Sequence, residues 1–422
     1  MSSLPSHRRL FRSFLSHAHV DKVVVDGLYD WLKNVAEVPV WYDAYNLAAS
    51  STIATELPDA ISLSRSMIIV LSNAAISSGW VKEEYSAAIQ ERTEHKQYRI
   101  IPICIEKCEV PGFLRTIKYI NLVEKKLDLE SASEIIGGLY YDNKTLQFET
   151  TQDVYISRSW SPAEADLANH ICRLLDKNGF RLVGDSDDQR DYDIERVKSL
   201  ISSCGGLVAI LPDRGQGKTS KFILQEIEIA RNLKLPYMIV AEPTVNLSED
   251  LAQIAIRISV DKLEENESNV KALQHAIEEL GYSWRRLTQE PYVFYATDLD
   301  EEHARRNLII KQAIQHITAT RCVIGDKIPT SHIREAITER ISQAFLVIAD
   351  ISNNNLNSCI EAGIAIGAKR PLVLLSSDSR PKPPFMLSNY QVFPYKDDLE
   401  LLGIIHKIAF PYRRRILNSE VI

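Results

Sequence analysis

The chain has 422 residues, more than one hydrophobic core usually serves, which predicts two or three domains. Hydrophobic residues make up 45% and charged residues 25%, ordinary globular values that exclude collagen-like, disordered and disulfide-scaffold classes. With 49 Lys and Arg against 56 Asp and Glu, the formal charge of -7 has the wrong sign for a protein that holds nucleic acid mainly by neutralising phosphates.

Neither a membrane segment nor a metal site is expected. The longest apolar runs, such as Met67–Leu71 and Pro371–Leu375, are strand-sized and fall short of the roughly 18 to 20 residues that cross a bilayer. The basic N-terminus has no apolar core after it, so we expect a cytoplasmic protein. The one close cysteine pair, Cys104 and Cys108, lacks the spacing of a zinc knuckle, and we expect all six cysteines to be buried thiols.

The first third of the chain alternates apolar strands with helical segments. The expected strands lie near Phe11–Ser16, Val38–Asp43, Met67–Ser72, Ile100–Ile105 and Tyr119–Val123. A helix over Asp21–Lys33 follows the first strand, and another begins at Trp80 after the third. Strands that are apolar along their length and alternate with helices indicate a parallel sheet covered on both faces.

The same order recurs twice further along the chain. The second copy opens with the strand Asp153–Ser157 and reaches an apolar strand at Gly206–Pro212. The third opens with Tyr292–Thr297 and reaches Ala344–Ile351. Three copies of one βα module explain this periodicity.

A glutamate marks the same point in each copy, in the first turns of the helix after the third strand. The three glutamates are Glu84, Glu226 and Glu361, and an alanine stands four positions after each. We therefore predict an α/β protein of three tandem flavodoxin-like, doubly wound parallel-sheet domains. The predicted domains cover residues 1–145, 146–284 and 285–422, with polar linkers at Tyr140–Thr150 and Tyr282–Glu290.

The first copy, up to about residue 140, resembles a Toll/interleukin-1 receptor (TIR) domain. FLSHAHVDK (Phe14–Lys22) is similar to the family's first strand and loop, and VWYDAYNL (Val40–Leu47) to its second strand with the terminal aspartate. SRSMIIVLSNAAISSGWVKEE (Ser64–Glu84) is similar to the third strand and the Trp-x-x-x-Glu helix start. The loop after the second strand usually carries glycine in this family, whereas Ala48–Ser51 occupies that region here.

The resemblance implies NAD+ as a substrate, with no cofactor. Bacterial and some animal and plant TIR domains cleave NAD+ at the nicotinamide–ribose bond, and the family's catalytic glutamate falls on Glu84. A preorganised carboxylate would stabilise the oxocarbenium character that develops on the ribose. The alternative is a solvated helix residue like its neighbour Glu83. The implied substrate-binding residues are Ser16, His17, Tyr42, Asp43 and Trp80.

Several of these residues have a structural alternative. Trp80 lies four residues before Glu84 on one helix face, where it would wall the ribose pocket or anchor the helix in the core. His17 would hydrogen-bond at the pocket rim or act as a general base. Asp43 would hold the following loop through backbone N–H groups. That loop packs TIR domains of the family into open-ended assemblies, which implies a homo-oligomer on activation.

The second copy is TIR-like but has only part of the motif. Phe222 and Glu226 stand at the positions of the tryptophan and the glutamate. RGQGKTS (Arg214–Ser220) looks like a phosphate loop, but Pro212 stands where a Walker loop needs glycine, which argues against ATP hydrolysis. The loop would cradle another phosphate at the helix start or be plainly solvated.

The third copy resembles the nucleoside 2-deoxyribosyltransferase-like group through ADISNNNLNSCIEAGIAIGAKRP (Ala349–Pro371). In that group an aspartate ends the strand, and a glutamate that acts on a ribose carbon opens the next helix. The candidate ligand site comprises Thr297, Asp350, Asn357, Glu361 and Gly363. A nucleotide-derived ligand, catalysis and a purely structural module remain alternatives. The basic cluster Arg413–Arg415 is expected to be solvated.

These features together favour a TIR-domain NAD+ glycohydrolase that releases nicotinamide and ADP-ribose. Its catalysis would be latent until a signal, such as a nucleotide second messenger, or assembly activates it. That layout suits bacterial anti-phage defence. The alternatives are a non-catalytic TIR scaffold that mediates protein assembly, and a TIR cyclase that makes a cyclic ADP-ribose messenger.

Overall fold

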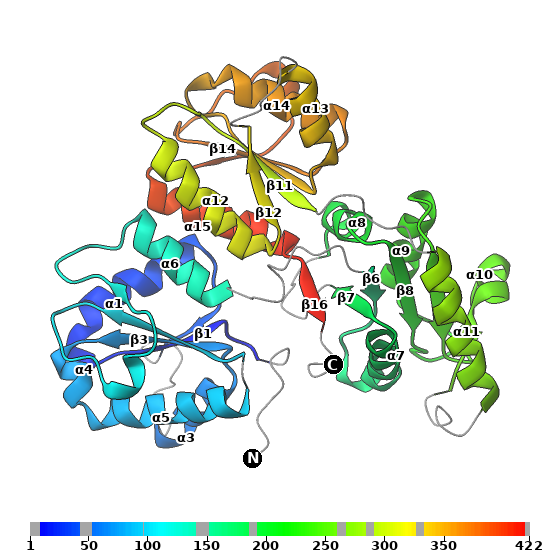
Figure 1. Cartoon of the computed structure of the whole chain (residues 1–422), viewed down its shortest axis with the longest axis horizontal. Helices are drawn as coiled ribbons and strands as arrows, with labels where there is room; N and C mark the ends of the chain where they lie inside the picture. Colours follow the sequence, from blue (N-terminus) through cyan, green and yellow to red (C-terminus); the bar gives the residue numbers. More distant parts are fainter. Residues whose placement is uncertain are drawn as a thin grey trace. The chain divides into compact units, whose positions relative to one another are not determined.

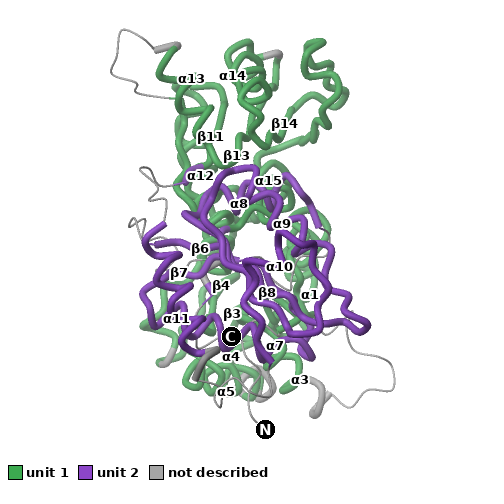
Figure 2. The backbone as a smooth tube through the Cα atoms, turned by 90° about the vertical axis from the view of Figure 1, so that its right-hand side faces the viewer, with its two compact units in different colours: residues 1–142, 293–413 green, residues 143–292, 414–422 purple. Residues whose placement is uncertain are grey.

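The computed structural model describes residues 9–42, 53–95, 97–140, 152–184, 192–259, 267–283, 291–325 and 333–417. The chain divides into two compact units, coloured in Figure 2. Unit 1 comprises Met1–Asp142 and Val293–Arg413, and unit 2 comprises Asn143–Tyr292 and Arg414–Ile422. The chain therefore returns to unit 2 after Arg413.

The first sheet of unit 1, to which the strands labelled β1 and β3 in Figure 1 belong, is fully parallel, with strand order β2-β1-β3-β4-β5. Its strands are β1 (Ser13–Ser16), β2 (Val40–Trp41), β3 (Ser66–Leu71), β4 (Arg99–Cys104) and β5 (Ile120–Asn121). Every residue of the central strand β3 is buried, as its unbroken apolar sequence predicts for a strand with both faces covered.

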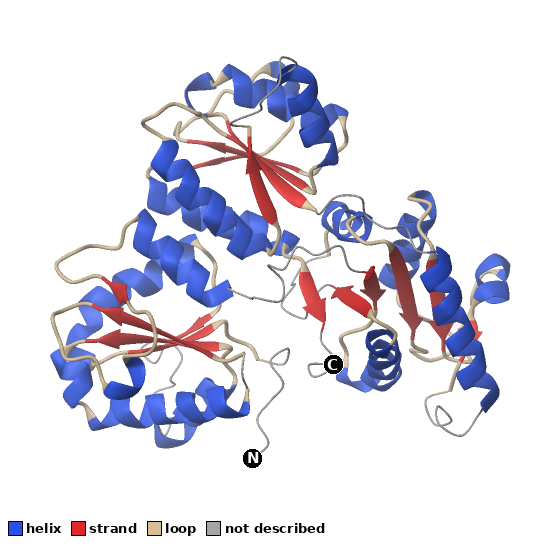
Figure 3. Ribbon diagram, viewed as in Figure 1, coloured by secondary structure: helices blue, strands red, loops and turns tan. Residues whose placement is uncertain are grey.

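Helices pack on both faces of this sheet (Figure 3). They are α1 (Lys22–Asp30), α3 (Ile53–Ser62), α4 (Asn73–Ser77), α5 (Gly79–Glu94) and α6 (Leu129–Tyr140), with the 3-10 turns η2 (His19–Asp21) and η4 (Gly112–Leu114). The predicted helix over Asp21–Lys33 continues past α1 as a π-helical segment, η3 (Trp31–Val35). The amide of Ala36 donates to the carbonyl of Trp31, five residues back, which is the bond that defines a π turn.

The other sheet of unit 1 has the order β12-β11-β13-β14-β15 and is also parallel where its pairing is described. Its strands are β11 (Tyr292–Ala296), β12 (Arg321–Ile324), β13 (Leu346–Asp350), β14 (Leu372–Ser376) and β15 (Val392–Pro394). Its helices are α12 (Ala304–Thr318), α13 (Ile333–Gln343), α14 (Leu356–Gly367) and α15 (Asp398–Ala409), with the 3-10 turns η7 (Ser352–Asn354), η8 (Phe385–Leu387) and η9 (Phe410–Tyr412).

The two sheets of unit 1 are joined by helices, because α12 and α15 pack against α6 and α15 packs against η3. The indole Nε1 of Trp31 donates to the carbonyl of Leu399 at 3.0 Å. On α15, Nδ1 of the buried His406 lies 2.6 Å from the carbonyl oxygen of Ala36. Through these contacts, helix α15 of the third copy packs against the first copy.

Unit 2 contains one sheet of order β10-β9-β8-β6-β7-β16. Its strands are β6 (Gln152–Ser157), β7 (Phe180–Gly184), β8 (Gly206–Leu211), β9 (Tyr237–Ala241), β10 (Ile256–Arg257) and β16 (Arg415–Leu417). Its helices are α7 (Ala165–Lys177), α8 (Ile194–Ser202), α9 (Lys221–Asn232), α10 (Glu249–Ile254) and α11 (Glu267–Ser283), with the 3-10 turn η5 (Pro162–Glu164). A core of buried side chains from β6, β7, β8, β9, α7 and α11 fills one side of the sheet.

Strand β16 comes from the far end of the chain and pairs antiparallel with β7. Leu417 packs where a Cβ on Gly184 would lie only 2.6 Å from its Cδ1, so the glycine makes room for the strand. Arg414, just before β16, is buried and bonds the carboxylate of Asp153, and Arg413 is also buried. The prediction of a solvated basic cluster is therefore wrong for both arginines, because charge patterning does not reveal a buried acceptor.

All three sheets share one internal strand order. Numbered within each copy, the order is 2-1-3-4-5, and β16 is an addition at the edge of the second sheet. The predicted α/β fold of three tandem flavodoxin-like parallel-sheet modules is confirmed. In this topology the carboxyl ends of the first and third strands lie side by side, which is where ligands bind in open α/β sheets.

Candidate functional site

The first copy brings two predicted site residues into direct contact. Ser16 is the last residue of β1, and Glu84 lies in the second turn of α5 after β3. The hydroxyl of Ser16 donates a hydrogen bond to Oε2 of Glu84. Glu84 is only 8% exposed, whereas its neighbour Glu83 is exposed, so Glu84 is not a solvated helix residue.

The helical periodicity of α5 explains why the carboxylate of Glu84 is buried. Ala88, one turn after Glu84, is fully buried. Residues four apart lie on the same helix face, so the face that packs through a small alanine also turns Glu84 inward. The side chain of Trp80, one turn earlier, lies outside the described residues, as do Asp43 and the loop 43–52.

Aromatic rings stand beside the end of β1. The rings of His17 and Tyr42 meet edge to face with centroids 5.1 Å apart, and Tyr29 lies 4.9 Å from Tyr42. Tyr42 is fully buried, and its hydroxyl donates to Asp26 at 2.8 Å. The ring of Tyr42 is thus held in place by burial and by its hydrogen bond, and it packs against the half-buried His17.

A second carboxylate lies at the same edge of the sheet and was not predicted from the sequence. The hydroxyl of Ser72, directly after β3, donates to Asp21 at 2.6 Å and accepts from the amide of Ala75 at 2.9 Å. It caps α4 while it holds η2. A serine before a helix is a recognisable cap in a sequence, but its partner across the sheet is not.

A cavity of about 260 Å³ lies between the end of β3 and α5. Tyr85 lines it together with Leu71 and Arg115, but Glu84 does not. The cavity therefore opens on a different face of α5 from the one that bears the predicted catalytic carboxylate.

The second copy repeats the positions but not the contact. Glu226 is 7% exposed, and Ala230, one turn later, is fully buried. The hydroxyl of Ser157, at the end of β6, is buried and has no hydrogen-bond partner among the described residues. Phe222 is 41% exposed and packs on Tyr192 with centroids 4.5 Å apart.

Polar groups of the RGQGKTS loop in the second copy already have hydrogen-bond partners within the protein. Arg214 bonds both carboxylate oxygens of Glu164, each at 3.0 Å. The amide of Gly215 donates to Asp213, and that of Lys218 donates to the carbonyl of Gly215. Because these groups already have partners, the geometry favours a structural loop over a phosphate cradle.

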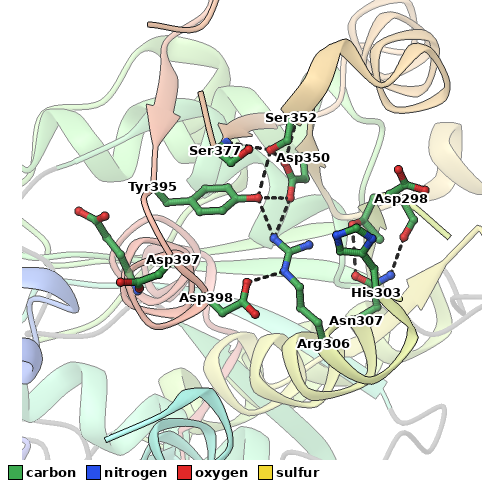
Figure 4. Close-up of polar contacts among 12 residues, drawn as sticks. Asp298, His303, Arg306, Asn307, Asp350, Ser352, Ser377, Tyr395, Asp397 and Asp398 are labelled. Carbon is green, nitrogen blue, oxygen red and sulfur yellow. Dashed lines mark hydrogen bonds and ion pairs between the residues drawn. The ribbon is translucent and has the colours of Figure 1, made fainter. Parts of the chain in front are cut away.

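In the third copy, Asp350 lies within a polar network at the end of β13 (Figure 4). Its Oδ2 accepts from the hydroxyl of Tyr395 at 2.7 Å and from Arg306 at 3.1 Å, and its Oδ1 accepts from Ser352 at 2.5 Å. Arg306 also donates to Asp398 at 2.7 Å. Burial, followed by the charge of Asp350, raises the pKa of Tyr395 to about 12.

Glu361 does not join that network. A Cβ on Gly325, just after β12, would lie 3.3 Å from its Oε1, so the carboxyl lies toward the β12 edge of the sheet. It has no hydrogen-bond or ion-pair partner among the described residues, and burial raises its pKa to about 7. A Cβ on Gly363 would meet open space.

The remaining residues of the predicted ligand site are dispersed. The hydroxyl of Thr297 donates to Asn307 at 3.2 Å, and Asn357 is exposed at the start of α14. Arg306 and Tyr395 were missed in the sequence, because neither lies next to a strand end that the motif marks. Outside this set, Asp298, Asp300 and His303 hold ligand-type atoms within 4.8 Å of one another but are solvent-accessible.

A comparison with family models identifies the first copy. The family model described as "TIR domain" matches residues 14–136. A search of curated proteins found no match. Among solved structures, the TIR domain of the Toll-related receptor TRR-2 from Hydra magnipapillata is 22% identical, with 26% of this chain and 83% of that chain covered and a TM-score of 0.24.

None of the described helices is long and apolar enough to cross a membrane.

The family match begins at Phe14 in β1 and ends in α6, and so encloses the Ser16–Glu84 contact. The chain therefore contains a TIR domain, which spans residues 14–136.

Proposed function

We propose that the chain is a TIR-domain NAD+ glycohydrolase in which Glu84 is the catalytic residue. The observation that carries the proposal is the buried carboxylate of Glu84, hydrogen-bonded to Ser16 at the carboxyl ends of β1 and β3. Loss of nicotinamide leaves positive charge on the ribose, and a fixed anion beside the sugar stabilises that charge. The bond from Ser16 orients the carboxylate before substrate arrives.

The direct test is nicotinamide release by the purified full chain and by Glu84→Gln. The variant keeps the shape of the side chain and its acceptor oxygen but removes the charge, so turnover should fall by about 100-fold or more. Glu83→Gln is the matched control, because Glu83 is the exposed neighbour on the same helix and should leave turnover unchanged. Unchanged turnover by Glu84→Gln would remove the proposed role.

A further control comes from the second copy. Glu226 has the same helical position and burial as Glu84, but it lies outside the matched TIR domain. Glu226→Gln should leave nicotinamide release intact if the first copy alone is catalytic. Loss of activity in Glu226→Gln with a folded protein would instead assign catalysis to the second copy.

Product analysis separates the two enzymatic alternatives. A glycohydrolase releases nicotinamide together with linear ADP-ribose, whereas a cyclase releases nicotinamide together with a cyclic ADP-ribose isomer. A scaffold releases neither at any protein concentration. The buried carboxylate supports the enzymatic alternatives over the scaffold, because burying a carboxylate costs free energy and buried acidic groups are more typical of active sites than of association surfaces.

For the third copy we propose a nucleotide-derived ligand at Glu361. The supporting observation is a half-buried carboxyl that has no hydrogen-bond or ion-pair partner among the described residues and lies beside Gly325 at the β12 edge of the sheet. A nucleoside phosphate that shifts the melting temperature of the native chain, but not that of Glu361→Gln, would support this site. An equal shift in both would place the ligand elsewhere.

The biological setting that we propose is a cytoplasmic anti-phage effector in bacteria. NAD+ loss would be restrained until a messenger or assembly into a homo-oligomer completes the sites. NAD+ turnover that rises more steeply than protein concentration, together with larger species by light scattering, is the expected sign of activation by assembly.

A further inference from the structure

A cleft of about 720 Å³ lies in unit 1, away from the Ser16–Glu84 contact. Its walls come from the start of β4, from β5 and from helices α6 and α12. Arg99 is the first residue of β4, so the cleft lies toward the amino ends of the strands, whereas Ser16 ends its strand. The volume falls within the range of about 300 to 1,000 Å³ typical of small-molecule sites.

The floor of the cleft is apolar. It is formed by the isoleucines Ile100, Ile101, Ile117 and Ile120. Three of the four are at least 94% buried, and Ile117 is half-buried. Because these side chains expose little surface of their own, such a floor favours a ring or an alkyl chain chiefly by removing the apolar surface of the ligand from water.

The rim is cationic. Arg92, Arg99 and Lys118 line the cleft against a single carboxylate, Glu134. Lys118 and Glu134 form an exposed ion pair at 2.5 Å, which is a weak interaction that a ligand can displace. Arg99 donates to the carbonyl of Gly138 on α6 at 3.2 Å, which anchors its guanidinium at the wall.

The α12 wall lies in the same positive potential. Burial lowers the pKa of His316, and the charges of Arg413 and Arg99 lower it further. The ring packs beside Gly137 of α6, where an added Cβ would lie 3.6 Å from His316 Cδ2. An anion in the cleft would be attracted by Arg99, a lining residue and one of the two cations that lower this pKa.

We propose that this cleft binds a small amphipathic organic anion, with its apolar part on the isoleucine floor and its anionic head beside Arg99 and Arg92. Because α6 and α12 belong to different sheets of unit 1, the bound ligand contacts both. A ligand that binds only the docked arrangement stabilises it by mass action. This site is independent of NAD+ cleavage at Glu84.

The test is calorimetric titration of the full chain with adenosine monophosphate, decanoate and inorganic phosphate. One organic anion should bind at least about ten-fold more tightly than phosphate, because phosphate cannot use the apolar floor. Tighter binding of adenosine monophosphate identifies a nucleoside phosphate site, and tighter binding of decanoate identifies a fatty-acid site. Amide exchange should slow in α6 and α12 on binding of the preferred probe.

Three variants locate the binding. Arg99→Gln and Arg92→Gln should each weaken binding of the preferred probe, Arg99→Gln by about ten-fold or more. Ser133→Trp occupies the cleft without removing a charge and should abolish binding. Arg115→Gln removes an exposed arginine outside the cleft and is the control.

Failure of both organic anions to bind would overturn the proposal. Binding that survives both Ser133→Trp and Arg92→Gln would also overturn it, because the ligand would then lie elsewhere. Arg92 is exposed and has no partner among the described residues, so its variant should fold even if Arg99→Gln does not.

Discussion

At the scale of single residues, the three copies differ in what the equivalent helical glutamate contacts. Each copy has a hydroxyl residue at the end of its first strand, namely Ser16, Ser157 or Thr297. Only Ser16 bonds the glutamate of its own copy within the described contacts, since Thr297 donates to Asn307 instead. The same architecture therefore carries three electrostatically different sites.

Ser16→Ala should lower nicotinamide release by about ten-fold, because one hydrogen bond to a charged group is worth roughly 1.5 to 3 kcal/mol and only part of it orients the carboxylate. The measurement is the rate at saturating NAD+. Ser13→Ala, in the buried first position of the same strand, is the control and should retain the native rate. Equal rates in native chain and Ser16→Ala would mean that the contact has no catalytic role.

Glu361 predicts a pH dependence of stability. Burial raises its pKa from 4.5 to about 7, so between these values the folded chain keeps a proton that the unfolded chain has lost. Stability therefore falls as pH rises through this window, by about 3 kcal/mol in all. Glu361→Gln cannot ionise and should unfold at a higher urea concentration than the native chain at pH 8, but not at pH 4. Parallel curves for the two proteins would contradict this assignment.

Side-chain contacts at the candidate sites were only partly predictable from the sequence. Contact between Ser16 and Glu84 was predictable because Ser16 ends the first strand and Glu84 lies in a helix that follows the third, and parallel topology brings these strand ends together. Asp21 and Arg306 were missed, because their partners lie on other elements and depend on packing distances. The predicted site in the third copy grouped Asp350 with Glu361, whereas Asp350 bonds Tyr395 and Arg306.

At the scale of elements, most strands were predictable because their apolar runs are long and unbroken. The prediction placed the central strand of the first copy at Met67–Ser72, and the structure has it at Ser66–Leu71. Strand β2 is shorter than expected, with Val40–Trp41 in place of Val38–Asp43, and Asp43 lies outside the described residues. The π-helical segment η3 was not predictable, because it packs against α15, a helix that is distant in sequence.

Helix α15 approaches η3 closely at Gly403. A Cβ there would lie 2.6 Å from Val35 Cγ1 and 3.3 Å from the amide nitrogen of Ala36. Gly403→Ala should therefore lower stability by about 1 to 3 kcal/mol, despite the better helix propensity of alanine. Gly27→Ala in α1 is the matched control, because its Cβ meets open space and should stabilise by about 0.5 to 1 kcal/mol. Thermal melts of both variants decide the matter, and a stabilised Gly403→Ala would contradict the close approach.

At the scale of the whole molecule, unit 2 depends on a segment distant in sequence. Arg181 bonds both oxygens of Asp153, at 2.6 and 2.7 Å, and the buried Arg414 bonds the same carboxylate. Burial by itself would raise the pKa of Asp153, but the two arginines outweigh it and hold the pKa below its usual value. This stabilisation is present above about pH 4 and is lost as pH falls below it.

Asp153→Asn should destabilise unit 2 more than Arg414→Met does. Loss of the carboxylate leaves two guanidinium groups without their anion, one of them buried, at a cost of about 3 to 5 kcal/mol. Loss of Arg414 leaves Asp153 paired with Arg181 and replaces a buried cation by an apolar side chain. Urea unfolding, followed by a probe in unit 2, gives the order, and a larger loss in Arg414→Met would contradict it.

Strand β16 has a consequence for how the protein is made. A ribosome completes β7 long before β16, and the entire third copy is synthesised between them. Until then the nascent middle sheet has an open edge that can pair with a neighbouring chain. A prematurely terminated chain leaves β7 as that edge, whereas in the full chain the three-residue strand β16 covers β7 and is the edge strand instead.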